Sequence, residues 1–134
     1  QHESVSEGST FFLPGTEGQK INQVVKPEKN ETVVVKNFPN AFVQTGLFEK
    51  LKEQKITRLV ITGMMTFMCV DATARVAKDL GFHCTLIHDA TAARDLEFNG
   101  HKVTASQVKT SFLAALSMTC DQVITCEDYL VNVD

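Results

Sequence analysis

The sequence has no tryptophan, only three prolines, and no apolar segment as long as a membrane span. A membrane-spanning helix needs roughly 20 consecutive apolar residues, so we expect no contact with a membrane. Basic residues do not gather either, because thirteen Lys and Arg are spread among sixteen Asp and Glu, for a net charge of −3. No basic stripe or run of like charge is present, so nucleic acid is not an expected partner.

The four cysteines, Cys69, Cys84, Cys120 and Cys126, show no C-x-x-C spacing. That spacing is typical of zinc sites and redox motifs, so the sequence indicates neither a zinc site nor a disulfide framework. The four histidines show no metal-ligand spacing. We therefore predict no metal, no other cofactor, and a reduced cytoplasmic setting.

With 134 residues, of which 43% are hydrophobic and 22% charged, the chain is predicted to form one globular domain over residues 1–134. Residues 1–31 carry no sustained period and are predicted to be mostly loop. The chain begins Gln1-His2-Glu3 without an initiator Met. We expect it to start inside a longer natural sequence.

Strand and helix patterns alternate along the rest of the chain, which favours a doubly wound α/β fold with a mainly parallel sheet. Strands are predicted at 32–36, 59–61, 83–87 and 122–126, with a loop and a possible helical turn over 89–101. Helices are predicted after Thr45, from Cys69 to Leu80, from a capping box at Thr104 and Gln107, and as a turn over 127–130. Ligands of such sheets bind beyond the carboxyl ends of the strands. Lys36 and Cys69 both follow strands and are expected to share one crevice.

Cys69 is the strongest candidate for chemistry. It follows a short buried strand and the flexible Gly63, and it begins a helical pattern that Gly81 ends. The unpaired N–H groups and the positive dipole end of a helix stabilise a thiolate. An inert core cysteine is the alternative, since Met68 and Val70 flank it.

The segment Gly63-Met64-Met65-Thr66-Phe67-Met68-Cys69-Val70, followed by Asp71-Ala72-Thr73-Ala74-Arg75, closely resembles the nucleophile motif of the isochorismatase-like cysteine hydrolases. The likeness extends upstream through 33–36 and Pro39-Asn40-Ala41-Phe42, and downstream through His88-Asp89-Ala90-Thr91 and 95–100. It covers nearly the whole chain. The resemblance implies a hydrolase acting on a small amide, in a homo-oligomer.

The resemblance also implies roles for single residues. Lys36 matches the triad lysine, which stabilises the thiolate of Cys69. Met64 and Met65 match a non-proline cis peptide, and the N–H groups of Met65 and Cys69 match the oxyanion hole. Asn40 replaces a frequent serine.

The walls of the pocket are less specific in the sequence. Phe38, Phe42 and Phe67 are candidates for substrate contacts, although aromatic residues more often belong to the core. Asp89 is expected to hydrogen-bond backbone groups, and Thr66 to orient the turn. Nicotinamidases of this superfamily bind a metal through an aspartate and histidines, but no D-x-H segment occurs here.

The third member of the family triad, an aspartate after the first strand, has no counterpart in the sequence. We therefore expect the first strand and first helix of the fold to lie outside it, which would leave a gap in the middle of the sheet. The predicted reaction is hydrolysis of a C–N bond in a small amide or ureido compound through a thioester on Cys69. The alternatives are a non-catalytic binding or oligomer-forming module, a vinyl ether hydrolase that does not need the cysteine, and a redox-sensing thiol.

Overall fold

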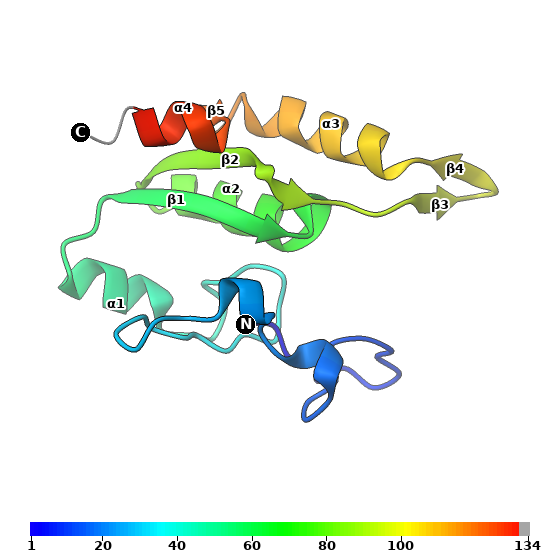
Figure 1. The fold of residues 1–134 in the computed structure, drawn as a ribbon, viewed down its shortest axis with the longest axis horizontal. Helices are drawn as coiled ribbons and strands as arrows, with labels where there is room; N and C mark the ends of the chain where they lie inside the picture. The colour runs from blue at the N-terminus through cyan, green and yellow to red at the C-terminus, as the bar shows by residue number, and fades with distance from the viewer. Residues whose placement is uncertain (132–134) are drawn as a thin grey trace.

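Three parallel strands form the main sheet of the computed structural model, which describes residues 1–131. Their order is β1-β2-β5, and each neighbouring pair runs in the same direction (Figure 1). Helices α2 and α3 make the crossovers between these strands, and they contact both β2 and each other. The α/β class with a parallel sheet is thus confirmed. The strands are Arg58–Met64 (β1), His83–Ala92 (β2) and Gln122–Ile124 (β5), and the helices are Asp71–Asp79 (α2) and Ala105–Leu116 (α3).

The core lies between β2 and the two crossover helices. Leu86 of β2 and Leu116 of α3 are fully buried, and the small residues Ala74 and Ala77 of α2 are also fully buried. Alanine carries the least side-chain bulk after glycine, so α2 can approach the sheet closely. Helix α3 begins at the predicted capping box, where Thr104 and Gln107 satisfy each other's backbone N–H groups.

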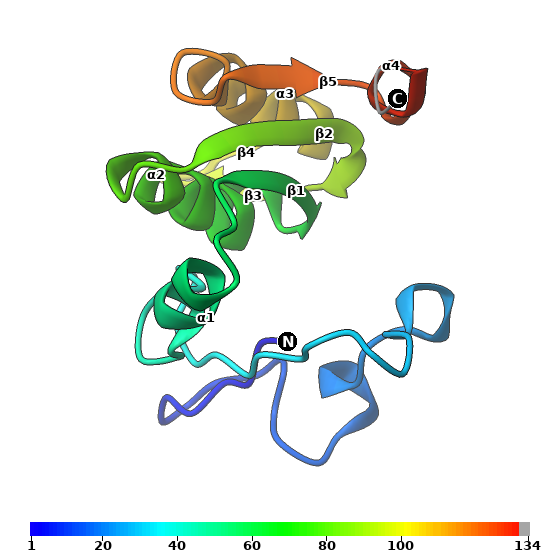
Figure 2. The ribbon, with the colours of Figure 1, turned by 90° about the vertical axis from the view of Figure 1, so that its left-hand side faces the viewer.

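The N-terminal segment and α1 (Leu47–Glu53) lie on the β1 side of the sheet, away from β5 (Figure 2). Residues 1–31 contain two short 3₁₀ turns, Glu17–Gln19 and Gln23–Val25. The N-cap of α1 is Gly46 and not Thr45 as predicted, although the Thr45 hydroxyl still accepts a hydrogen bond from the Leu47 N–H at 3.2 Å.

The prediction of a buried strand over 32–36 is wrong. Only one isolated parallel bridge forms here, between His2 and Lys36, and Val33 and Val35 are 45% and 46% exposed. The backbone is held by Gln1 and Glu3, because the Lys36 N–H donates to the Gln1 carbonyl and the Glu3 N–H donates to the Lys36 carbonyl, both at 2.9 Å. Three consecutive valines indicate an extended backbone, but they do not supply the neighbouring strand that would bury them.

A hairpin replaces the loop that was predicted over 89–101. Strand β2 continues to Ala92, and an antiparallel pair, β3 (Leu96–Phe98) and β4 (His101–Val103), projects beyond the body of the molecule (Figure 1). The turn residues Asn99 and Gly100 have φ values of 51° and 77°. Positive φ at both central residues is the requirement of a type I′ turn, which Asn-Gly favours. At the C-terminal end, the predicted helical turn is confirmed as α4 (Cys126–Val131).

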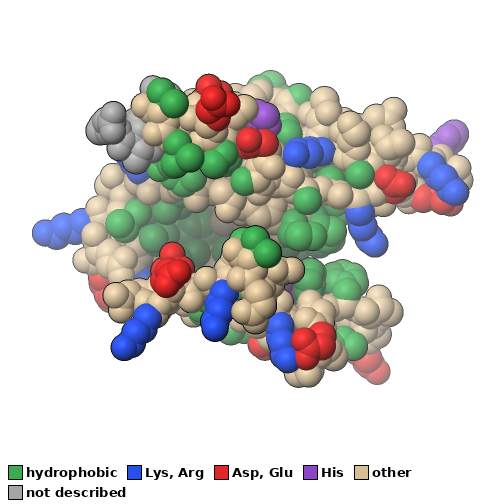
Figure 3. All heavy atoms as spheres, viewed as in Figure 1, with side chains coloured by type: hydrophobic (Ala, Val, Ile, Leu, Met, Phe, Trp, Pro, Cys, Tyr) green, Lys and Arg blue, Asp and Glu red, His purple; other side chains and the backbone are tan. Residues whose placement is uncertain are grey.

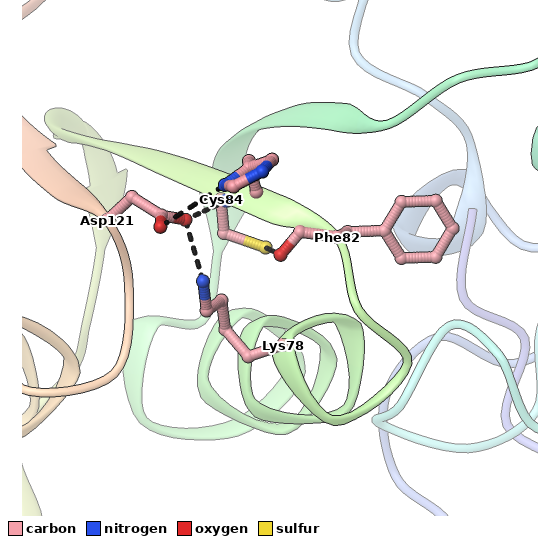
Figure 4. A network of polar contacts seen from close by, with 5 residues as sticks. Lys78, Phe82, Cys84 and Asp121 are labelled. Carbon is pink, nitrogen blue, oxygen red and sulfur yellow. Dashed lines mark hydrogen bonds and ion pairs between the residues drawn. The ribbon is translucent and has the colours of Figure 1, made fainter.

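A network around Asp121 joins the starts of β2 and β5 to the end of α2 (Figure 4). The Asp121 carboxylate accepts hydrogen bonds from Lys78 Nζ at 2.8 Å and from the Cys84 N–H at 2.7 Å, and His83 Nδ1 lies 3.4 Å away. The bond from Lys78 and that from Cys84 hold the pKa of Asp121 well below its ordinary value.

We expect Asp121→Asn to lower the thermal unfolding midpoint at pH 7. A carboxyl group whose pKa is depressed by folding adds stability above its unfolded pKa, and this stability is lost as the pH falls through the folded pKa. The difference between the wild type and the variant should therefore shrink below about pH 4. Thermal scans across this range would measure it. Asp79→Asn, on the exposed end of α2, removes the same charge without these contacts and is the matched control. A difference that persists unchanged at low pH would contradict this interpretation.

Candidate active site

Cys69 lies in a single π-helical turn, Thr66–Val70, which joins the end of β1 to α2. The Met65 carbonyl accepts hydrogen bonds from the Met68 N–H at 3.0 Å and from the Val70 N–H at 3.2 Å. Thr66 is fully buried, and its hydroxyl donates to the Ala92 carbonyl at 3.0 Å. The turn is therefore fixed both to its own strand and to the end of β2. The helical pattern that was predicted to begin near Cys69 begins three residues earlier, at Thr66.

The peptide bond between Met64 and Met65 is cis. It stands at the end of β1, immediately before the turn that carries Cys69. The structure has this bond at the position that the resemblance implies.

Lys36 reaches the sulfur of Cys69 from the opposite wall. Its Nζ lies 3.3 Å from Cys69 Sγ, although the two residues are 33 positions apart in the chain. The same nitrogen lies 2.8 Å from the Phe38 carbonyl, 3.1 Å from the Pro39 carbonyl and 3.1 Å from His2 Nδ1. A cation this close to the sulfur is an arrangement found around reactive cysteines. The structure thus brings together the two residues that the sequence suggested as catalytic.

The loop after Lys36 is hydrogen-bonded to α2, which fixes Lys36 relative to the helix that follows Cys69. The Ala41 N–H donates to the Thr73 hydroxyl at 3.0 Å, and that hydroxyl donates to the Pro39 carbonyl at 3.4 Å. Thr73 lies one turn after Cys69, and Pro39 is one of the carbonyls around Lys36 Nζ. One side chain therefore couples the position of the lysine to the helix behind the thiol.

A cavity of about 370 Å³ opens beside the Cys69 sulfur. In the space-filling view, hydrophobic side chains gather along the hollow between the sheet and the N-terminal segment (Figure 3). Parts of the chain that are far apart in sequence line the cavity: Gln1, His2, Phe12, 18–21, Lys36, Ala41, 61–64, Cys69, Val70 and Thr73.

The three phenylalanines suggested as substrate contacts lie outside this lining. Phe42 stacks on Phe82 of the core with ring centroids 6.0 Å apart, and Phe67 meets the ring of Phe112 edge-on at 6.2 Å. Phe38 is 41% exposed and contributes its carbonyl to Lys36 instead. Packing against neighbouring aromatic rings accounts for the positions of Phe42 and Phe67.

Phe12 and His2 line the cavity, whereas the sequence favoured burial under a loop for Phe12 over a place in a pocket and gave His2 no role in the site. Their rings are in edge-to-face contact at 5.5 Å. The only signal for Phe12 was the isolated apolar cluster 11–13 within an otherwise polar segment. His2 carried no local signal, because its partner Lys36 is 34 residues away. Burial, followed by the nearby charge of Lys36, lowers the pKa of His2.

The charge around the cavity is positive. Lys20 and Lys36 line it, and within residues 1–131 no Asp or Glu does. The same part of the chain contains no group of three or more His, Cys, Asp and Glu side chains that could hold a metal ion. No helix among these residues is long and apolar enough to cross a membrane. The expected absence of a metal or other cofactor stays a prediction.

The other cysteines have different surroundings. Cys84 and Cys120 are buried in the core, and burial raises the pKa of Cys84 to about 11 and also raises the pKa of Cys120. Cys126 is exposed at the start of α4, where its N–H donates to the Asp89 carboxylate at 2.9 Å. Asp89 therefore bonds a backbone group, as the sequence led us to expect. Among the four thiols, Cys69 alone lies beside a lysine ammonium in a cavity.

A parallel α/β fold with a lysine-paired cysteine just after the end of strand β1 defines the class of protein. Comparison with known sequences then places it: residues 1–119 match the family model of the isochorismatase domain, and the chain belongs to the isochorismatase family.

Two relatives and a solved structure illustrate this membership. The uncharacterised isochorismatase family protein YddQ of Bacillus subtilis is 41% identical over 130 residues, covering 97% of this chain and 72% of YddQ. Nicotinamidase 3 of Arabidopsis thaliana is 31% identical over 113 residues, covering 83% of this chain and 55% of that protein. A crystal structure from Oleispira antarctica, assigned to the isochorismatase hydrolases, matches with a TM-score of 0.90 and 44% identity, covering 98% of this chain and 69% of that one.

Proposed function

We propose that this protein hydrolyses a C–N bond of a small amide or ureido compound, with Cys69 as the nucleophile. The observation that carries the proposal is the 3.3 Å contact between Lys36 Nζ and Cys69 Sγ, beside the cavity that both residues line. The likeness to a nicotinamidase, an enzyme named for an amide substrate, supports the choice of bond.

In the proposed reaction, the Cys69 thiolate forms a bond to the carbonyl carbon and the carbonyl oxygen becomes an oxyanion. The N–H groups of Met65 and Cys69 stabilise that oxyanion, as the resemblance implies. The C–N bond then breaks, the nitrogen leaves with a proton as ammonia or an amine, and water hydrolyses the thioester. Family members use an aspartate for the proton transfers, whereas the described residues supply the nucleophile and the cation.

The apolar part of the cavity lining bears on the substrate. The side chains of Phe12, Ile21 and Ile61 favour a ligand with one apolar face.

Brief treatment with iodoacetamide at neutral pH tests the proposal. We expect Cys69 and the exposed Cys126 to be alkylated well before the buried Cys84 and Cys120, and amide hydrolysis to fall in proportion to the labelling of Cys69. Mass spectrometry of the labelled peptides, together with ammonia release from a panel of small amides and ureido compounds, gives both quantities. Cys126→Ser provides the control in which only Cys69 remains accessible.

Two results would overturn the proposal. Hydrolysis that survives complete labelling of Cys69 would remove the nucleophile. A protein that labels at Cys69 but releases ammonia or amine from no compound of the panel would favour the non-catalytic binding module.

A further inference from the structure

The hairpin formed by β3 and β4 ends in an exposed turn, Asn99-Gly100. Phe98 pairs with His101 across the hairpin, so the two turn residues lie outside the ladder. The hairpin leaves the end of β2 and lies beside α3, whereas the N-terminal segment lies on the opposite side of the molecule (Figure 1). The turn therefore lies away from the gap that the sequence led us to expect between β1 and residues 32–36.

An asparagine that precedes a glycine can lose its side-chain amide without an enzyme. The backbone nitrogen of the glycine bonds to the side-chain carbonyl carbon and closes a five-membered imide ring. Glycine has no Cβ, so the residue after the asparagine does not crowd this ring. A Cβ at Gly100 would have no heavy atom beyond its chain neighbours within 4 Å. The turn therefore leaves space for the ring to close.

The two groups that would react are free of hydrogen bonds. Within residues 1–131, the Gly100 N–H donates to no oxygen and the Asn99 side chain neither donates nor accepts. A group that is already hydrogen-bonded has to break that bond before it reacts, and each broken bond adds to the barrier. The turn at the tip of the hairpin imposes no such cost.

The other asparagines in the described part of the chain are restrained, and none of them precedes a glycine. Asn22 and Asn40 each accept a hydrogen bond from the N–H two residues later, at 3.0 and 2.9 Å. The Asn37 amide donates to a backbone carbonyl at 3.0 Å. The N–H that follows Asn30 donates to the carbonyl of the residue three positions before it, also at 3.0 Å. Asn99 therefore differs from these four in both of its reacting groups.

We propose that Asn99 is a site of spontaneous deamidation in the native protein. The Gly100 nitrogen loses its proton and bonds to the side-chain carbonyl carbon of Asn99, and the side-chain nitrogen leaves as ammonia. Water then opens the imide ring at either carbonyl, which leaves aspartate or isoaspartate at position 99. The whole change consumes one water, releases one ammonia and adds one negative charge to the hairpin. It uses no residue of the candidate active site, so it goes beyond the proposed function and does not depend on it.

The two products differ in their effect on the hairpin. Asp-Gly favours a type I′ turn as Asn-Gly does, so aspartate keeps the turn. Isoaspartate adds a carbon atom to the backbone, which a two-residue turn in this register does not accommodate. Strand β4 leads directly into Thr104, the N-cap of α3. An opened turn therefore loosens the entry to that helix.

Ageing of the purified protein at mildly alkaline pH tests the inference. Digestion at acidic pH suppresses further deamidation, and mass spectrometry then gives the ratio of acid to amide in each asparagine peptide. We expect Asn99 to react at least about tenfold faster than Asn22, Asn30, Asn37 and Asn40, which corresponds to a barrier lower by at least about 1.4 kcal/mol. A rate no higher than that of these four would overturn the inference, and so would conversion that occurs only after the protein is unfolded.

Two variants complete the test. Asn99→Asp carries the added charge on an ordinary backbone, so the isoaspartate form of the aged protein should be cleaved by trypsin after Lys102 faster than this variant. Equal cleavage would overturn the expected opening of the turn. Cys69→Ala should deamidate at the wild-type rate, because the reaction needs no active site, and a failure of the proposed function would be recognised separately. A slower rate in Cys69→Ala would show that the reaction is not spontaneous.

Discussion

Replacing Cys69 with alanine is expected to lower amide hydrolysis by at least about a thousandfold, as is typical when a covalent nucleophile is removed. The loss should appear in kcat, because alanine removes the atom that attacks the carbonyl and leaves the cavity otherwise lined as before. Steady-state kinetics on any amide that the wild type hydrolyses would measure it. Cys126→Ala, at the exposed thiol, should retain wild-type kcat.

The outcome also separates two reaction types within the family. A vinyl ether hydrolase of the isochorismatase kind does not need the cysteine, so Cys69→Ala would then leave most of the activity in place. Full activity of this variant on any substrate would show that Cys69 is not the nucleophile for that reaction.

Leu86→Ala is expected to destabilise the fold by about 2–5 kcal/mol, the range for removing a large aliphatic side chain from a packed core. Leu86 is fully buried in β2, the strand that pairs with both β1 and β5. Typical domains have only about 5–15 kcal/mol of stability in total, so the variant should lose a large share of it. Denaturant unfolding of the full chain would measure the difference.

Leu130→Ala is the matched control, because Leu130 lies on α4 and is 66% exposed. Its free energy of unfolding should change by less than about 0.5 kcal/mol. A Leu86→Ala variant no less stable than Leu130→Ala would mean that the centre of the sheet is not the centre of the core.

Elements whose neighbours are close in sequence could be predicted. The strand at 59–61, the helix after Cys69 and the capping box at Thr104 depend on local periodicity and on bonds across three or four residues, and all three are present. A strand over 32–36 would need a partner strand, which three valines do not encode. Residues 32–36 form only an isolated bridge, between Lys36 and His2. The hairpin over 96–103 was not predicted, although Asn99-Gly100 is a typical hairpin turn. Its flanking strands are only three residues long, which is too short to show an alternating pattern.

The residues of the site, like the elements of the fold, could be predicted only where a local motif marks them. Cys69 and Lys36 were found through a motif and a resemblance, and the structure brings their side chains together. His2 could not be found, since its place beside the cavity comes from a contact with Lys36, a residue 34 positions away. Phe38, Phe42 and Phe67 were chosen for their residue type, but residue type does not tell a core ring from a pocket wall. Phe12 lines the cavity instead.

The separation in sequence of the cavity walls has a consequence for how the protein folds. Lys36 and Cys69 are 33 residues apart, and His2 and Lys36 are 34 apart, so the environment of the thiol forms only when distant segments meet. Contacts of this kind carry a cost in loop-closure entropy and slow the folding of a chain. The crossover from β1 through α2 to β2, by contrast, joins elements that follow one another in the chain. The sulfur of Cys69 therefore acquires its neighbouring cation only when the segment that carries Lys36 has docked, and the reactivity of this thiol during refolding should report that long-range step.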